Sequence, residues 1–123
     1  MHKDRIHKEK AMKTLSEVMT PEQTKLHEAA SYAVDVLRAL ANQDRLLILC
    51  FLSQGEANVS NLENKLGIRQ PTLSQQLGIL RKQKLVETRR EGKQIFYRID
   101  DKRVLSLLQT MYSLFCPEEL KEE

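Results

Sequence analysis

Residues 70–99 read QPTLSQQLGILRKQKLVETRREGKQIFYRI, and this stretch decides the fold. Leucines recur in its first half at the i, i+4, i+7 spacing that places apolar side chains on one face of a helix. Its second half contains two strand-like runs, 85–90 and 94–99, on either side of Glu91-Gly92-Lys93, which predicts a β-hairpin. The stretch therefore predicts a helix that begins at Gln70-Pro71, with a hairpin behind it. The inward-facing leucines of this helix are Leu73, Leu77 and Leu80. This rotation turns Thr72, Gln75 and Gln76 outward.

A shorter helix is predicted directly before this one. Ser60-Asn61-Leu62-Glu63 has the form of a capping box, and Gly67 is a suitable end for the helix that it opens. Two helices joined by a tight glycine turn form a helix-turn-helix, whose second helix enters the DNA major groove. A basic hairpin behind it would be the wing. The predicted fold is therefore a winged helix-turn-helix, mainly α with a small β-hairpin.

Two further helices are predicted upstream. Thr20-Pro21-Glu22-Gln23 combines a capping residue, a proline suited to the first helical position and a glutamine that completes a capping box, so the first helix runs from here to about Ala41. Asn42 can cap a helix over the apolar run 46–52, which Gly55 ends. Such a run could also be a buried strand, but it is rich in leucine rather than in β-branched residues, which favours a buried helix. The apolar stripe expected on the first helix consists of Val34, Leu37 and Leu40.

The last helix is predicted from about Asp101 to Phe115, where Pro117 stops it. Its apolar stripe is wider than one small domain needs in order to cover itself. Together with the first helix it could form the interface of a homodimer, whose two-fold symmetry would match a palindromic DNA site. Simple docking of the helix onto the core is the alternative. The stripe consists of Val104, Leu107, Leu108, Met111, Leu114 and Phe115.

The chain has 123 residues, of which 41% are hydrophobic, and this is enough for one domain with a modest core. We expect a polar, basic arm over residues 1–19, a DNA-binding and dimerisation domain over 20–116 and an acidic tail over 117–123. No segment resembles a signal peptide or a bilayer-spanning helix. These observations predict a cytoplasmic protein without a membrane partner, in a compartment where cysteines are normally reduced.

Basic side chains gather near the predicted hairpin, although the net charge of the whole chain is only +3. From Ile79 to Arg98, seven basic side chains accompany two acidic ones, which is the charge distribution expected for contact with DNA phosphates. A hairpin that is merely solvated is the alternative. The basic residues are Arg81, Lys82, Lys84, Arg89, Arg90, Lys93 and Arg98.

The first turns of the second helix are expected to carry the residues that contact DNA bases. Glutamine amides can pair with adenine through two hydrogen bonds, and hydroxyl groups can bind bases or phosphates. For Ser74 a hydrogen bond to the local backbone is an equally good interpretation. The candidates on the helix are Gln70, Thr72, Ser74, Gln75 and Gln76. The candidates for contact with phosphates, which set the register, are Arg69 and Arg81 near the helix, with Arg89, Arg90 and Lys93 of the hairpin on phosphates or in the narrow groove.

Cys50 and Cys116 are the only cysteines of the chain. A thiolate can attack a persulfide or be oxidised to a sulfenic acid, and a second thiol can then close a bridge. Free cysteines are also commonly buried as small apolar side chains, and Cys50 lies in an apolar run. A non-DNA-binding dithiol redox protein is a further alternative, but the chain has no Cys-x-x-Cys motif and neither cysteine has a His or Lys beside it in sequence. We therefore do not expect an enzyme.

Three motifs, in order and suitably spaced, make the region of about residues 30–116 resemble the ArsR family of bacterial winged-helix repressors. The resemblance implies homodimers that repress promoters and leave DNA when an inducer binds. Gln76 stands where the family commonly has His, which could alter operator preference but not the fold. The motifs are 37–42 with 45–49, 71–77, and 85–92 with Phe96-Tyr97.

Many members of this family sense metal ions, so a metal-responsive repressor is an alternative. Their commonest ligand motif has cysteines at the start of the third helix, and residues 57–62 here contain no thiol. Another group uses His and Asp on the last helix, which here offers Asp100 and Asp101 but no His. His2 and His7 could be ligands, but in a polar arm we expect them to be solvated. Transition metals need more nitrogen or sulfur ligands than remain, so no metal or other cofactor is expected.

The positions of Cys50 and Cys116 are similar to those in the dithiol branch of the family, which responds to reactive sulfur or oxidants. This resemblance implies that the second and last helices meet within one subunit. A disulfide or a longer polysulfide bridge between the two thiols would then change the spacing of the two recognition helices. By analogy alone, the regulated genes would serve sulfide or oxidant responses or virulence.

Overall fold

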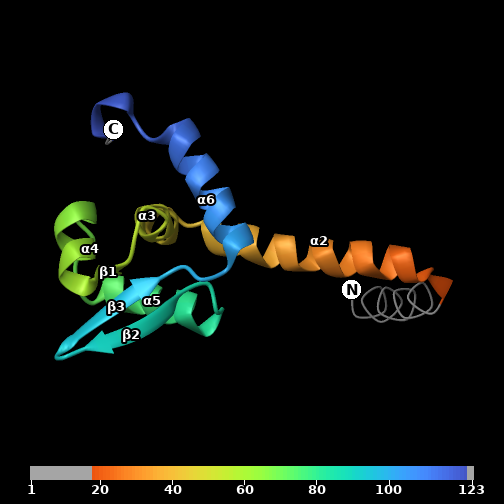
Figure 1. Ribbon diagram of the computed structural model, residues 1–123, viewed down its shortest axis with the longest axis horizontal. Helices are drawn as coiled ribbons and strands as arrows, with labels where there is room; N and C mark the ends of the chain where they lie inside the picture. The colour runs from red at the N-terminus through yellow and green to blue at the C-terminus, as the bar shows by residue number, and fades with distance from the viewer. Residues whose placement is uncertain (1–17, 122–123) are drawn as a thin grey trace, which may run out of the picture. The chain divides into compact units, whose positions relative to one another are not determined.

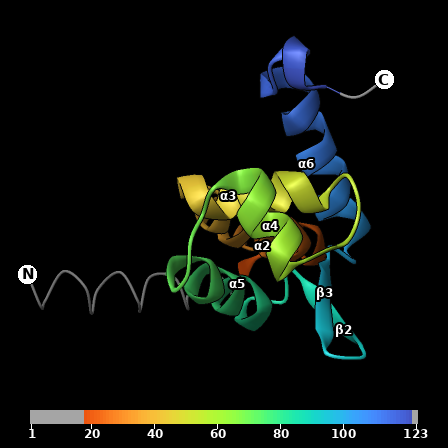
Figure 2. The same cartoon turned by 90° about the vertical axis from the view of Figure 1, so that its left-hand side faces the viewer.

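The computed structural model describes residues 18–121 and confirms a mainly helical fold with a small antiparallel sheet (Figures 1 and 2). Most of the expected basic arm, with His2 and His7, and the last two residues of the expected acidic tail lie outside the described residues. The chain divides at Asp35 into two compact units, and the second unit holds the winged helix. The elements are α2 (Pro21–Leu40), α3 (Gln43–Leu52), β1 (Ala57–Asn58), α4 (Val59–Leu66), α5 (Thr72–Lys82), β2 (Glu87–Glu91), β3 (Gln94–Arg98), α6 (Lys102–Phe115) and the short 3₁₀ helix η1 (Glu118–Leu120).

The helix α2 begins with the predicted capping box. The backbone N–H of Thr20 donates to Gln23 Oε1 at 3.0 Å, and the N–H of Gln23 donates to Thr20 Oγ1 at 3.1 Å. These bonds satisfy two of the backbone donors that a helix start leaves without intrahelical partners.

The apolar stripe predicted on α2 is buried only in part within the single chain. Leu40 is buried, but Val34 and Leu37 are 43% and 55% exposed, and the buried neighbours of Leu40 are Val36 and Ala39. Val36, Ala39 and Leu40 have the i, i+3, i+4 spacing of one helix face, and Leu37 lies outside that face.

The core of the second unit is built around α3, which packs against α4, α5 and α6. Its apolar run is a buried helix, as predicted, and Asn42 caps it by accepting the Arg45 N–H at 3.1 Å. Figure 2 shows α4 and α5 beside α3, with the hairpin at one end of this group. The side chains that lose nearly all contact with solvent are Ile48, Leu49, Leu62, Leu73, Leu77, Leu80 and Leu108.

The helix-turn-helix consists of α4, the turn after it and α5. The capping box of α4 was predicted at Ser60 and Glu63, and this is wrong, because Asn58 caps the helix instead. Asn58 Oδ1 accepts the N–H of Asn61 at 2.8 Å, and Asn61 Oδ1 accepts the N–H of Asn58 at 3.3 Å. Asparagine is as good a cap as serine, and the extended backbone of Asn58 suits the capping position.

Gly67 ends α4 as predicted. Its backbone has φ of 69°, the left-handed conformation that glycine adopts without steric cost, and its N–H bonds to the Glu63 carbonyl at 3.0 Å.

The wing is the hairpin of β2 and β3. Glu91 pairs with Gln94, so the turn contains only Gly92 and Lys93, and Gly92 supplies the positive φ of 62° that such a short turn needs. A third strand, β1, was not predicted. It pairs antiparallel with β3, which gives the strand order β1-β3-β2.

The last helix, α6, has the predicted bounds, and Asp101 caps it by accepting the Arg103 N–H at 2.8 Å. Only Val104 and Leu108 of its predicted apolar stripe are buried. Leu114 and Phe115 are 70% and 74% exposed. None of the helices within residues 18–121 combines the length and the apolar composition that crossing a bilayer requires.

Candidate DNA interface and cysteine pair

The helix α5 presents a polar outer face at its N-terminal end. The burial of Leu73, Leu77 and Leu80 fixes its rotation and leaves Thr72 and Gln75 exposed, as predicted, and Ser74 exposed as well. The hydroxyl and amide groups on this face can donate and accept hydrogen bonds. The edges of the bases in the major groove offer matching acceptors and donors.

Gln70 differs from the expectation of a base contact. Pro71 occupies the N-cap position and makes no side-chain capping bond, and the Gln70 amide supplies one instead. Gln70 Oε1 accepts the backbone N–H of Ser74 at 3.1 Å, so this oxygen is engaged in starting the helix. This bond uses the backbone N–H of Ser74 and not its hydroxyl group, so the choice between a local backbone bond and a DNA contact for that hydroxyl stays as the sequence left it.

Gln76 was predicted to face outward, and this is wrong, because its side chain is half-buried. Its Oε1 atom accepts a hydrogen bond from Arg45 Nη1 at 3.2 Å. Arg45 lies on α3, so Gln76 connects the recognition helix to the core rather than to open solvent.

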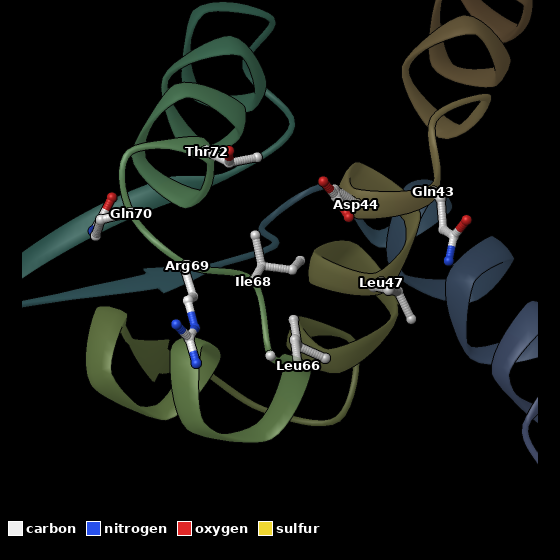
Figure 3. Close-up of a pocket in the computed structure, with 9 residues that line it drawn as sticks. Gln43, Asp44, Leu47, Leu66, Ile68, Arg69, Gln70 and Thr72 are labelled. Carbon is white, nitrogen blue, oxygen red and sulfur yellow. The ribbon is translucent and has the colours of Figure 1, made fainter.

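Two hollows flank the recognition helix. The first, of about 390 Å³, lies between the start of α3 and the turn before α5. Figure 3 shows Arg69 and Gln70 on one side of it, and Asp44 and Leu47 of α3 on the other. The second, of about 350 Å³, lies where α5 gives way to β2 and is lined by Arg81 and Lys84. Arg69 and Arg81 are exposed at opposite ends of α5, as phosphate-binding residues would have to be.

Arg89 of the wing already has partners within the protein. Its Nε atom lies 3.0 Å from both carboxylate oxygens of Glu56, its Nη1 atom lies 2.8 Å from Glu91 Oε2, and its guanidinium stacks 4.5 Å from the centre of the Phe96 ring. The hydrogen bond from Arg89 lowers the pKa of Glu56 below its ordinary value. These contacts count against the phosphate contact predicted for Arg89 and make it a brace between the wing and the segment before β1.

Arg90 and Lys93 are the wing cations that remain available to DNA. Both are exposed, and neither has an ion pair with any residue of the described range 18–121. Successive residues of a strand point to opposite faces, so Arg90 points away from the face that Arg89 shares with Phe96. The unpaired positive charge of the wing therefore lies on the Arg90 face and at the tip.

Cys50 and Cys116 lie on two helices that pack together, as the resemblance implied. Cys50 is on α3, Cys116 ends α6, and both thiols are half-buried. Gln109 of α6 donates to the carbonyl of Ser53, which follows the end of α3, at 3.4 Å. Burial raises the pKa of Cys50, and the charge of Cys116 raises this pKa further, so the two sulfur groups interact electrostatically.

A metal site finds no support in the described part of the chain. Residues 18–121 contain no group of three or more His, Cys, Asp or Glu side chains that could hold a metal ion.

A helix-turn-helix with a polar recognition helix and a cationic wing defines a winged-helix DNA-binding protein. Residues 42–88 match the model of the bacterial regulatory proteins of the arsR family. The biofilm growth-associated repressor of Agrobacterium fabrum is 50% identical over 95 residues, which cover 76% of this chain and 81% of that protein. This chain belongs to the ArsR family of DNA-binding transcriptional regulators.

Two further comparisons agree with the dithiol branch. The transcriptional activator HlyU of Vibrio cholerae is 36% identical over 91 residues, which cover 74% of this chain and 84% of that protein. The crystal structure of the repressor BigR from Xylella fastidiosa has a TM-score of 0.69 and 42% identity, and covers 81% of this chain and 100% of that one. BigR and HlyU typify the branch that the cysteine positions indicated. These relatives are regulators and not enzymes, which argues against the alternative of a dithiol redox enzyme.

Proposed function

We propose that this protein is a homodimeric repressor that binds a palindromic operator through α5 and the wing, and that leaves the operator when Cys50 and Cys116 become linked. The observation that supports the switch most directly is the packing of α3 against α6, since Cys50 lies on α3, Cys116 follows the end of α6 and both thiols are half-buried. A link between these thiols would tie the end of α6 to α3, and α3 packs against the recognition helix. Repression of sulfide, oxidant or virulence genes in the bacterial cytoplasm rests on analogy with the family.

The chemistry requires one nucleophile and one resolving thiol. Because burial, followed by the charge of Cys116, raises the pKa of the Cys50 thiol and so lowers its thiolate fraction, we assign the first attack to Cys116. Its thiolate takes the outer sulfur of a small-molecule persulfide, which forms a Cys116 persulfide and releases a thiol. The Cys50 thiolate then attacks the inner sulfur, expels hydrosulfide and forms the disulfide. With a hydroperoxide, Cys116 becomes a sulfenic acid as the peroxide is reduced to an alcohol, and Cys50 displaces water. Retention of further sulfur atoms would make a polysulfide bridge instead.

The dimer rests on apolar side chains that the single chain leaves in water. Three large apolar side chains are more than half exposed to solvent in the single chain. They are Leu37 of α2 and Leu114 and Phe115 of α6. Side chains of this size and exposure on the first and last helices are suited to cover one another across a two-fold axis.

Binding to the DNA upstream of the protein's own gene, before and after treatment with glutathione persulfide, tests the switch. The reduced protein should bind, and the persulfide should release it with formation of a Cys50–Cys116 link that intact-mass spectrometry detects. Cys50→Ser and Cys116→Ser should bind equally well and stay bound after treatment. Release of the double variant by persulfide would place the sensor elsewhere in the chain.

A further inference from the structure

Arg45 joins three helices of the second unit. It lies half-buried in the first turn of α3, where Asn42 Oδ1 accepts its backbone N–H at 3.1 Å. Its Nε atom donates to the carbonyl of Ala39, in the last turn of α2, at 2.8 Å. Its Nη1 atom donates to Gln76 Oε1, on the recognition helix α5, at 3.2 Å. One guanidinium therefore links the end of α2, the start of α3 and the middle of α5.

The position of the guanidinium has a physical reason at α2. The last carbonyls of a helix have no intrahelical partners and carry the negative end of the helix dipole, so a cation with N–H donors is stabilised there. Arg45 satisfies the Ala39 carbonyl in this way. Because the guanidinium is a rigid planar fork, anchoring one of its edges at Ala39 fixes the direction in which the other N–H groups point. That direction leads to Gln76.

The same bond makes Gln76 a poor reader of DNA bases. A glutamine recognises adenine by using its amide oxygen and its amide nitrogen together. In Gln76 the oxygen already accepts from Arg45 and the side chain is half-buried, whereas the neighbouring Gln75 is exposed. The two adjacent glutamines are chemically identical, yet only Gln75 is free of this contact with the core.

We infer that Gln76 is a positioning residue, and that the Arg45–Gln76 hydrogen bond sets the angle at which α5 presents Thr72 and Gln75 to the major groove. This inference rests on the proposed binding of operator DNA through α5. Loss of the bond should lower affinity for the operator without changing which bases are preferred, because the residues that read the bases remain in place.

The test starts with duplexes selected from random DNA by the wild-type dimer, followed by the same selection with variants. Gln76→Met and Arg45→Met each remove the bond, and Gln75→Met is the matched control on the exposed face. Gln76→Met, Arg45→Met and the double variant should each bind the selected duplex about tenfold more weakly than wild type, with no further loss in the double variant. All three should select the wild-type motif, and Gln75→Met should select a motif changed at one base pair in each half-site.

A second readout separates positioning from DNA contact. Gln76→Glu keeps the oxygen that accepts from Arg45, so it should restore most of the affinity, whereas a negative charge in contact with phosphates or base acceptors would weaken binding further. If Arg45→Met fails to fold, the comparison of Gln76→Met with Gln76→Glu decides alone, since both leave the contact between Arg45 and Ala39 intact.

Three results would overturn the inference. They are a changed base preference in Gln76→Met, additive losses in the double variant, and weaker binding of Gln76→Glu than of Gln76→Met. A wild-type protein that selects no motif at all would overturn the proposed DNA-binding function and the inference with it, whereas the three results above leave that function standing.

Discussion

The thiol of Cys50 is half-buried on α3, and burial, followed by the charge of Cys116, raises its pKa. Alkylation by iodoacetamide requires the thiolate, and a raised pKa lowers the thiolate fraction at any given pH below it. In Cys116→Ser, which keeps the larger cause of the shift, Cys50 should react more slowly than free cysteine at about pH 7, by roughly tenfold for each unit of pKa difference. The rate should approach that of free cysteine as the pH rises through the pKa of the folded protein.

Mass spectrometry of the alkylated peptide measures this rate, and unfolding in guanidinium chloride provides the control, because it exposes the thiol and should restore the free-cysteine rate. A Cys50 that reacts in the folded protein as fast as free cysteine at neutral pH would contradict both the shift and the assignment of the first attack to Cys116.

The partners of Gln76 and Arg89 are contacts of single residues that the sequence could not predict. The leucine spacing correctly placed Gln75 on the outer face of α5, since helical periodicity is a local property. The partner of Gln76 is 31 residues away in sequence, and the partner Glu56 of Arg89 is 33 residues away. Neither contact leaves a local pattern, so the rotation of the helix and the position in the hairpin, on which the two assignments rested, gave no sign of these partners.

At the scale of elements, the two faces of the wing differ in charge. Arg89 is paired with Glu56 and Glu91, whereas Arg90 has no ion pair within the described residues. We expect Arg90→Ala to weaken binding to all DNA sequences and to reduce the salt dependence, the slope of log K against log salt, by about one unit per subunit. Arg89→Ala should change this slope little, because removing it takes away a brace and not a phosphate contact.

Titrations of fluorescent operator DNA at several salt concentrations measure both slopes, and each variant serves as the other's control, since both remove one positive charge from β2. Equal reductions would show that Arg89 leaves its carboxylates to bind DNA, and an unchanged slope in Arg90→Ala would exclude this face of the wing from the interface.

The elements that sequence predicted well are those with local signals. Caps and periodicity located α2, α3, α5 and α6 to within a few residues, and the glycine turn located the wing. The strand β1 was missed because its two residues carry no periodicity and it forms only by pairing with β3, about forty residues further along the chain. The missed strand also explains the misplaced cap of α4, since the residue that ends β1 is the residue that caps the helix.

At the scale of the whole molecule, the exposed apolar residues predict the oligomeric state. Phe115 is 74% exposed in the single chain, so Phe115→Glu should leave the fold intact. If α6 lies in the dimer interface, the same change buries a charge there and should turn a dimer into a monomer, with loss of operator binding. Sedimentation velocity at low micromolar concentration measures the state directly.

Leu47→Glu is the matched control, because Leu47 is also a large apolar side chain that is partly exposed in the single chain. It lies at the hollow beside the recognition helix and not at the end of α6. This variant should remain a dimer. A wild-type protein that sediments as a monomer, or a Phe115→Glu variant that stays dimeric, would exclude the end of α6 from the interface.

Asn58 belongs to several parts of the winged helix at once. It ends β1, caps α4, and donates from its Nδ2 atom to Gln94 Oε1 at the base of the wing turn at 3.2 Å. Tilting the hairpin would therefore strain a hydrogen bond to the residue that caps the first helix of the helix-turn-helix. The wing and the helix-turn-helix of one subunit are therefore already aligned before DNA binds. Little conformational entropy is lost in aligning these two parts on binding. In the proposed dimer, linking the two thiols should then change the affinity mainly through the spacing of the two subunits, and only to a small extent through rearrangement within either one.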